Sequence, residues 1–203
     1  GDFKQSKGDV DLTASGLKSP YGRADSSRIK GPFALGYGAG PLTASYAGQP
    51  EIRGVQVAQN LLRQAGSLSA STTGTPVGPI VDRLAKAVQQ AGNQLDISSD
   101  IKFSKAAGQT TLSLNALTAR SRSGATLDLS DPLLLAFTDK NIRMLADGNI
   151  RLEGGGFPNA KFVLDDGSLS RGFSGRLEMA NFQAGSAQLK IPAMAFSPTR
   201  QGG

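Results

Sequence analysis

The sequence predicts a mainly β protein, a curled antiparallel sheet that forms a groove, with one amphipathic α-helix packed on or in it. Three observations support this fold class. Short segments in which apolar and polar residues alternate recur along most of the 203-residue chain, and glycines, 26 in all, separate many of them. A single long segment has helical periodicity instead. A sheet of ten or more twisted strands curls, closes or splits, so the strands are expected to form a bent surface.

The predicted helix spans residues 75–92. Thr75 suits the N-cap, and Gly92 suits the position after the last turn. Asp82 precedes Lys86 by four residues, the favoured order for an ion pair on a helix. The segment has no Trp or Phe and only two basic residues, so packing on a sheet is favoured over lying on a membrane surface. The predicted apolar face of the helix consists of Val77, Ile80, Val81, Leu84 and Val88.

The chain is expected to be one continuous domain in three segments. Residues 1–74 form a β segment rich in Gly and Pro, residues 75–92 form the helix, and residues 93–203 form an antiparallel meander. Within the first segment, residues 21–50 are poorly periodic because glycine interrupts them, and residues 60–65 could form one or two helical turns. The glycines at both ends of the chain suggest a piece of a larger protein.

Turn residues divide the meander. Chain reversals are expected at 106–109 and 121–124, and hairpins around Asp147-Gly148-Asn149 and Asp165-Asp166-Gly167. Leu117 and Ala119 continue the alternation of the preceding strand only if a bulge separates the two halves. The segment Leu133–Phe137 is apolar at every position, so both its faces should be covered, with the helix as one candidate cover.

Composition argues against several classes of function. The chain has no His and no Cys, which removes the commonest general base, thiol catalysis and thiolate metal sites. The net charge of +6 is spread out, so no nucleic acid is expected, although a weak attraction to anionic lipid head groups remains open. Asp165 and Asp166 suit a turn, which leaves a glycosidase pair or a calcium site only as alternatives. We therefore expect no enzyme and no cofactor.

Six motifs occur in order from the predicted helix to the end of the meander. They are TPVGPI (75–80), DRLAKA (82–87), QAG (90–92), DIKF (100–103), GNIRLEGGGFP (148–158) and AQLKIP (187–192). Together they resemble the YdbH-type branch of the AsmA-like superfamily, a group related to TamB. The resemblance covers about residues 50–197, leaves out the first quarter of the chain, and depends on the order and character of the motifs rather than on catalytic residues.

The resemblance implies a β-taco-like groove in the periplasm, within an inner-membrane-anchored protein of the Gram-negative cell envelope. It also implies transport of phospholipid between the inner and outer membranes, with components of both membranes as partners. Open sheet edges in such a segment suggest edge-to-edge self-association. The rival hypothesis is a structural β module of a surface or adhesin-type assembly without a ligand.

The residues themselves agree with a lipid-binding groove. An apolar sheet face that one helix covers only in part is a large exposed patch, and such patches mark binding sites. Acyl chains suit it because each buried CH2 contributes about 0.8 kcal/mol without a directional hydrogen bond. The predicted lining consists of Ile101, Phe103, Leu112, Leu114, Leu127, Leu129, Ile150, Leu152, Leu177, Met179, Leu189 and Ile191. Each of these could equally be an ordinary core residue.

Overall fold

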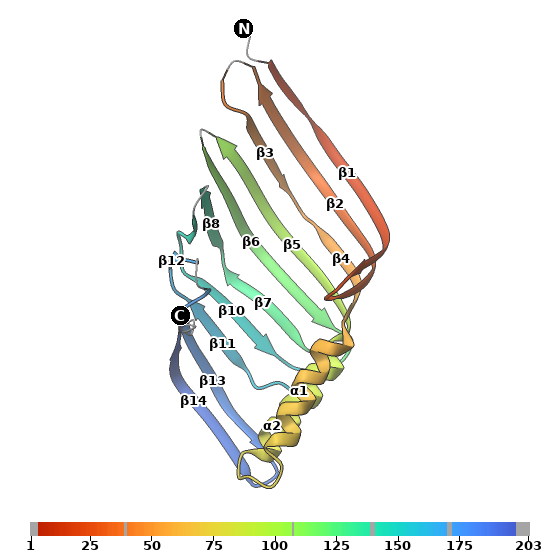
Figure 1. The fold of residues 1–203 in the computed structure, drawn as a ribbon, viewed down its shortest axis with the longest axis vertical. Helices are drawn as coiled ribbons and strands as arrows, with labels where there is room; N and C mark the ends of the chain where they lie inside the picture. Colours follow the sequence, from red (N-terminus) through yellow and green to blue (C-terminus); the bar gives the residue numbers. More distant parts are fainter. Residues whose placement is uncertain (1–3, 39, 107, 139–140, 170–171, 198–203) are drawn as a thin grey trace.

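The structure is a computed structural model that describes residues 4–38, 40–106, 108–138, 141–169 and 172–197. These residues form one antiparallel sheet of 14 strands and a pair of helices, which confirms the predicted fold class (Figure 1). The prediction of a single helix is wrong, because a second one precedes it. The helices interrupt the sheet only in sequence, since the strands on either side of them pair with each other.

The elements follow one another along the sheet with few crossovers. The sheet order is β1-β2-β3-β5-β6-β7-β10-β11-β13-β14, with β4 beside β2 and β5, β8 beside β6, and β9 between β8 and β12. The bounds are β1 (Lys4–Ser19), β2 (Gly22–Tyr37), β3 (Thr43–Gly48), β4 (Glu51–Val57), α1 (Gln59–Ser71), α2 (Gly78–Ala91), β5 (Asn93–Ala106), β6 (Gln109–Ser121), β7 (Thr126–Asp131), β8 (Leu133–Thr138), β9 (Asn141–Met144), β10 (Gly148–Glu153), β11 (Ala160–Leu164), β12 (Gly167–Ser168), β13 (Gly175–Ala184) and β14 (Ala187–Phe196).

Several of these strands are halves of longer ones. β3 and β4 both pair with β2 and β5, and only Gln49-Pro50 separates them. β7 and β8 both pair with β6 and are separated by Pro132. Proline lacks the N–H that a ladder needs, so it interrupts pairing without reversing the chain. These interruptions therefore divide long strands without changing their partners.

The two expected hairpins are not formed. β9 and β10 flank the first proposed turn, but β9 pairs with β8 and β12 whereas β10 pairs with β7 and β11. Gly148 belongs to β10, and a Cβ there would meet the buried Leu133 side chain at 2.0 Å. β11 and β12, which flank Asp165-Asp166, likewise pair with other strands. Both motifs are interruptions in a continuing strand.

The N-terminal segment is more regular than expected. The poorly periodic residues up to Tyr37 form the single 16-residue strand β2, which pairs with β1 along almost its whole length. The expected one or two helical turns at 60–65 extend into the 13-residue helix α1. Residues 67–71, which the sequence places in the β segment 1–74, are the last residues of this helix.

The helix α2 begins later than expected. Val77 is its N-cap and is 52% exposed, so Thr75 does not cap it and the apolar face begins with Ile80. Gly92 is the C-cap, as expected, and the Lys86 ammonium lies 2.8 Å from the Asp82 carboxylate. Ala85 and Ala87 are buried in addition to Ile80.

The apolar segment Leu133–Phe137 forms β8, and its two faces are covered unequally. Leu133 is buried in a core cluster with Leu129, Met144 and Leu164, against which Leu169 and Phe196 also pack. Ala136 is buried on the opposite face. The hydrophobic residues that pack against this cluster lie in strands or in the loop after β12, so other parts of the sheet, and not the helix, cover this face of β8.

The two edges of the sheet differ. β1 pairs only with β2, has 16 residues and contains no proline. β14 pairs only with β13, has 10 residues and contains Pro192, and its register shifts twice. Proline and bulges are among the features that natural edge strands use against further pairing. Lysine does not distinguish the two edges, because β1 contains Lys4, Lys7 and Lys18. β14 is therefore the more protected edge, whereas β1 has neither a proline nor a shift in its register with β2.

Candidate functional site, the apolar face of the sheet

The pairing register places the predicted lining residues on one face of the sheet. Residues directly opposite each other on neighbouring antiparallel strands project to the same side, so pairs can be followed across the sheet as rows. One row runs Ile52, Ile97, Ala119, Leu127, Leu152, Ala160, Met179 and Ile191. The row one residue away projects to the other side and runs Glu51, Ser98, Thr118, Asp128, Arg151, Lys161 and Glu178.

Four further rows belong to the apolar side, which we call the apolar face. A register shift between Asp100 and Ile101 adds one residue to β6, so Leu114 and Leu117 both project to this face; the expected bulge is confirmed. The four rows are Leu35–Ala44–Lys105–Thr110–Phe137–Ile142, Phe33–Tyr46–Phe103–Leu112–Leu135–Met144, Gly48–Ile101–Leu114–Leu133 and Leu129–Ile150–Phe162–Leu177–Met194.

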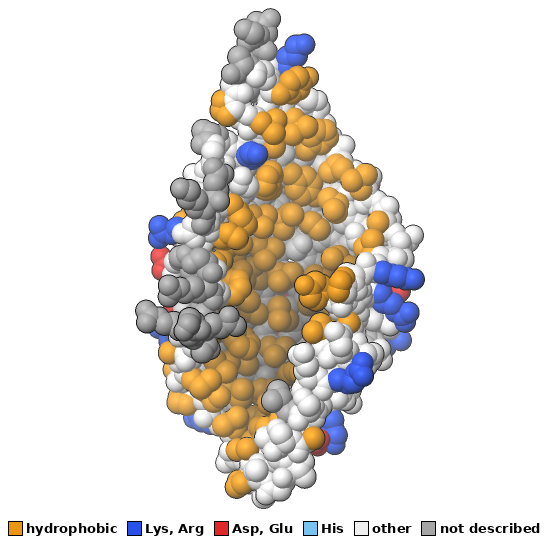
Figure 2. Space-filling model, in the orientation of Figure 1, with side chains coloured by type: hydrophobic (Ala, Val, Ile, Leu, Met, Phe, Trp, Pro, Cys, Tyr) orange, Lys and Arg blue, Asp and Glu red, His pale blue; other side chains and the backbone are white. Residues whose placement is uncertain are grey.

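Most side chains of the apolar face are neither fully exposed nor fully buried. Eleven of the twelve predicted lining residues are half-buried, and Leu129 alone is buried, at 8% exposure, within the β8 core cluster. Figure 2 shows hydrophobic side chains following this side from the N-terminal to the C-terminal strands, with Lys and Arg gathered mainly along the perimeter. Half-burial is what side chains experience when neighbours flank them but no second layer covers them.

Sequence reasoning missed part of this face. Phe33 and Tyr46 extend it into the N-terminal strands, Phe162 lies between Ile150 and Leu177, and Leu135 and Met194 continue the rows beyond Leu112 and Leu177. The Tyr46 hydroxyl donates to the Lys30 carbonyl at 3.1 Å, and burial raises the pKa of Tyr46. The ring therefore stays neutral, its polar atom is satisfied by backbone, and it presents hydrocarbon to the face.

The helix α2 walls off one end of the apolar face. Ile80, 4% exposed, packs with Phe182 and Ala184 of β13, and Leu84, Met179 and Leu189 pack around them. The helix also lies against β5, and a Cβ at Gly156 in the β10–β11 loop would sit 3.5 Å from Ala87. In Figure 1 both helices run along the lower ends of the strands, and in the described residues no helix lies at the opposite ends.

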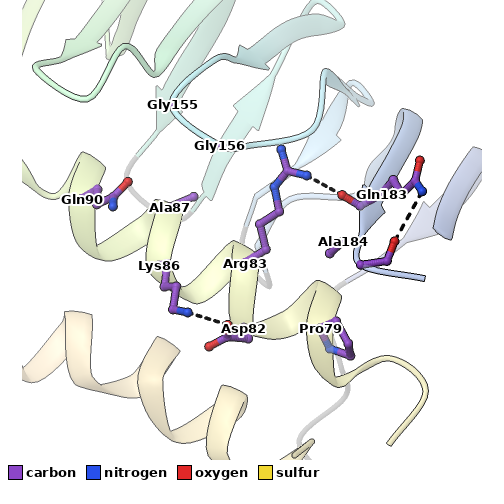
Figure 3. A pocket seen from close by; sticks show the side chains of 11 residues that line it. Pro79, Asp82, Arg83, Lys86, Ala87, Gln90, Gly155, Gly156, Gln183 and Ala184 are labelled. Atoms are coloured by element: carbon purple, nitrogen blue, oxygen red, sulfur yellow. Dashed lines mark hydrogen bonds and ion pairs between the residues drawn. The ribbon is translucent and has the colours of Figure 1, made fainter. Parts of the chain in front are cut away.

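Polar contacts fix this wall in place (Figure 3). The Arg83 guanidinium donates to the Gln183 carbonyl and lies 4.6 Å from the centre of the Phe182 ring. Hydrogen bonds from Lys86 and Ser69 lower the pKa of Asp82, and the Ser69 contact ties α1 to α2. A pocket of about 460 Å³ opens between α2, the β10–β11 loop and the β13–β14 turn. Its charged side chains are engaged with each other or with backbone.

We expect Arg83→Gln to weaken the packing of α2 against β13. The variant loses the hydrogen bond to Gln183 and the contact with Phe182, together about 1–2 kcal/mol of docking free energy. Hydrogen exchange of residues 78–91 should accelerate accordingly. Arg63→Gln is the matched control, because the Arg63 side chain donates at 3.3 Å to the Gln59 carbonyl within α1. Equal exchange in both variants would show that Arg83 does not hold α2.

The site that the described residues form is an apolar surface. Within the described ranges, no group of three His, Cys, Asp or Glu side chains is placed to hold a metal ion, and neither helix has the length and hydropathy to cross a bilayer. What the fold presents is a broad hydrocarbon surface, closed by α2 at one end. In comparisons with known proteins, the chain matches no family model, no curated protein and no solved structure.

Proposed function

We propose that this chain is a segment of a lipid-binding β groove that holds phospholipid acyl chains and conducts them between membranes. One observation carries the proposal: five rows of almost entirely apolar residues cross the sheet on one face, and most of their side chains stay half-exposed. Soluble proteins seldom leave a continuous apolar surface of this extent uncovered unless it binds something.

The physical properties of the face suit hydrocarbon chains that slide. Burial of each CH2 contributes about 0.8 kcal/mol, and hydrophobic attraction has no preferred direction. An acyl chain can therefore shift along rows of Leu, Ile, Met and Phe without breaking specific bonds. The ten strands of the main sheet order span roughly 43 Å at about 4.8 Å per strand, which gives a continuous path rather than a single pocket.

The motifs that resemble the AsmA-like superfamily support a cellular location for this groove. On that basis we propose the periplasm of a Gram-negative cell, as part of an inner-membrane-anchored protein with partners in both membranes. Phospholipid or free fatty acyl chains are the proposed ligands. This assignment depends on the resemblance, whereas the binding of hydrocarbon depends only on the geometry of the sheet.

Site-specific photo-crosslinking tests the binding. A benzoylphenylalanine at position 103 replaces the half-buried Phe103 on the apolar face, and the same residue at position 104 replaces Ser104 on the opposite face of β5. After illumination in cells, we expect a phospholipid adduct by mass spectrometry at position 103 and none at position 104. Native mass spectrometry of gently purified protein should also show bound phospholipid.

The rival, a structural β module, gives a different result. In that case no lipid would be attached at either position, and delipidated protein would not take up a fluorescent fatty acid. The apolar face would instead be covered by another protein surface, which would appear as a protein–protein crosslink at position 103. That pair of results would refute the lipid proposal.

A further inference from the structure

One charged residue interrupts the apolar face. Lys105 follows Phe103 by two positions on β5, so both side chains project to the same side. Its direct neighbours across the ladder are Ala44 and Thr110, and the row continues to Leu35 on one side and Phe137 on the other. Lys102, three positions earlier, projects to the opposite face beside Ser113.

Lys105 is distinctive in two respects. Among the described residues of the five rows, it is the only charged one. It is exposed, and none of the ion pairs found between described residues involves it. Its ammonium group is therefore available to an anion that approaches from the apolar face.

The position of Lys105 along the strand is equally informative. β5 starts at Asn93, directly after the C-cap of α2, and ends at Ala106. Twelve residues of strand, about 40 Å, separate Asn93 from Lys105. The groove thus has a wall of helix at one end and a cation at the other, with uncharged rows between them.

We propose that Lys105 binds the anionic head group of an amphiphile, a phosphate or carboxylate, at the open end of the groove. The hydrocarbon tail then lies along β5 and β6, over Phe103, Leu112 and Ile101, and points toward α2. This inference rests on the proposed function and adds to it the class of head group and the orientation of the lipid.

Lys105 and an anionic amphiphile have matching polarity. A long Lys side chain can lay its methylenes on an apolar surface and keep its ammonium in water at the rim. An amphiphile has the same division, with a charged end that must stay hydrated and a tail that gains by burial. Binding in this orientation pairs the two charges at the rim, whereas the reverse orientation buries a charged head against α2 and leaves Lys105 without a partner.

Binding of matched ligands to delipidated protein tests the head-group site. The ligands are a long-chain fatty acid and the alcohol of the same length, and the variants are Lys105→Glu and Lys102→Glu, which change net charge equally. We expect Lys105→Glu to weaken fatty acid binding about tenfold, the size of one charge-assisted hydrogen bond. Binding of the alcohol should be unchanged in both variants, and Lys102→Glu should leave fatty acid binding near the wild-type value.

The controls separate the possible failures. Circular dichroism should show that both variants keep the wild-type fold. If wild-type protein binds neither ligand, the proposed function fails. If it binds both and Lys105→Glu weakens them equally or not at all, the groove stands and the head-group site is refuted. Displacement of the fatty acid by millimolar inorganic phosphate alone would indicate an anion site without a tail path, and would refute the proposed orientation.

Quenching measurements test the orientation. The chain has no cysteine, so single Cys variants can carry a fluorophore at Ala44, beside Lys105, or at Ala119, whose partner on β5 is Ile97. Eight residues of β5, about 27 Å, separate the two levels. A fatty acid with a doxyl group near its carboxylate should quench position 44 more strongly, and one with the group near its methyl end should quench position 119 more strongly. The opposite pattern, or equal quenching, would overturn the orientation.

Discussion

Ala119→Glu should reduce fatty acid binding to the delipidated protein about 100-fold, the effect of placing an ionised carboxylate where hydrocarbon would lie. Ala119 is half-buried in the row that joins Ile97 to Leu127, near the middle of the apolar face. A carboxylate there must stay hydrated. Its water would therefore separate an acyl chain from the neighbouring Leu and Ile side chains.

The adjacent residue supplies the control. Thr118→Glu introduces the same side chain on the opposite face of β6, beside Asp128 and Ser98. We expect it to leave fatty acid binding within about twofold, because a side chain on the opposite face of β6 does not occupy the surface where the acyl chain lies, and solvent screens its exposed charge. Titration with a fluorescent fatty acid measures both variants. Similar losses in the two variants would show that binding does not take place on the apolar face.

Met144→Ala should lower the free energy of unfolding by about 3 kcal/mol, the usual cost of a Met-to-Ala change in a well-packed core. Met144 is only 1% exposed and packs with Leu129, Leu133 and Leu164 in the buried cluster around β8. Deleting its side chain leaves a cavity that these strands cannot close without shifting their register. Urea denaturation followed by circular dichroism measures the change.

Ile142→Ala is the control for this prediction. Ile142 lies two residues before Met144 on the same face of β9 and is 41% exposed, so its truncation should cost no more than about 1 kcal/mol. Equal losses would mean that the cluster is no better packed than the rim. A loss in neither variant would show that β9 contributes little to the stability of the sheet.

The alternation of side chains can be read from the sequence because one face of the sheet is apolar and the other is mostly polar. Ile101, Phe103, Leu112 and Leu114 stand out for this reason, and the register brings them together across β5 and β6. The N-terminal strands were harder to read. Gly31 and Gly36 break the alternation around Phe33, although the backbone remains extended and paired.

The prediction of two hairpins that do not form was wrong for a different reason. Asp and Gly are common wherever strand pairing stops, both where the chain reverses direction and where the strand is only interrupted. Which outcome occurs depends on the partners of the flanking strands, and β9 and β10 each have partners other than one another. That information lies in distant segments, so a local pattern cannot supply it.

Lys105 illustrates a signal that could have been used. In the sequence, Lys102 and Lys105 form a basic cluster typical of a solvated strand face. Their spacing of three residues is odd, however, and in a strand an odd spacing places two side chains on opposite faces. One of the pair therefore had to share a face with Phe103 and Ile101. The identity of the open end still required the structure, because only the position of α2 distinguishes the two ends.

The unequal borders of the sheet have a consequence for size. A strand added at β1 would find a full-length row of unpaired backbone groups, and each addition would lengthen the hydrocarbon path by about 4.8 Å. At β14, Pro192 and the two register shifts oppose such growth. The length of the hydrocarbon path therefore grows by whole strands at the β1 edge and stays fixed at the β14 edge. Each added strand leaves the chemistry of the existing surface unchanged.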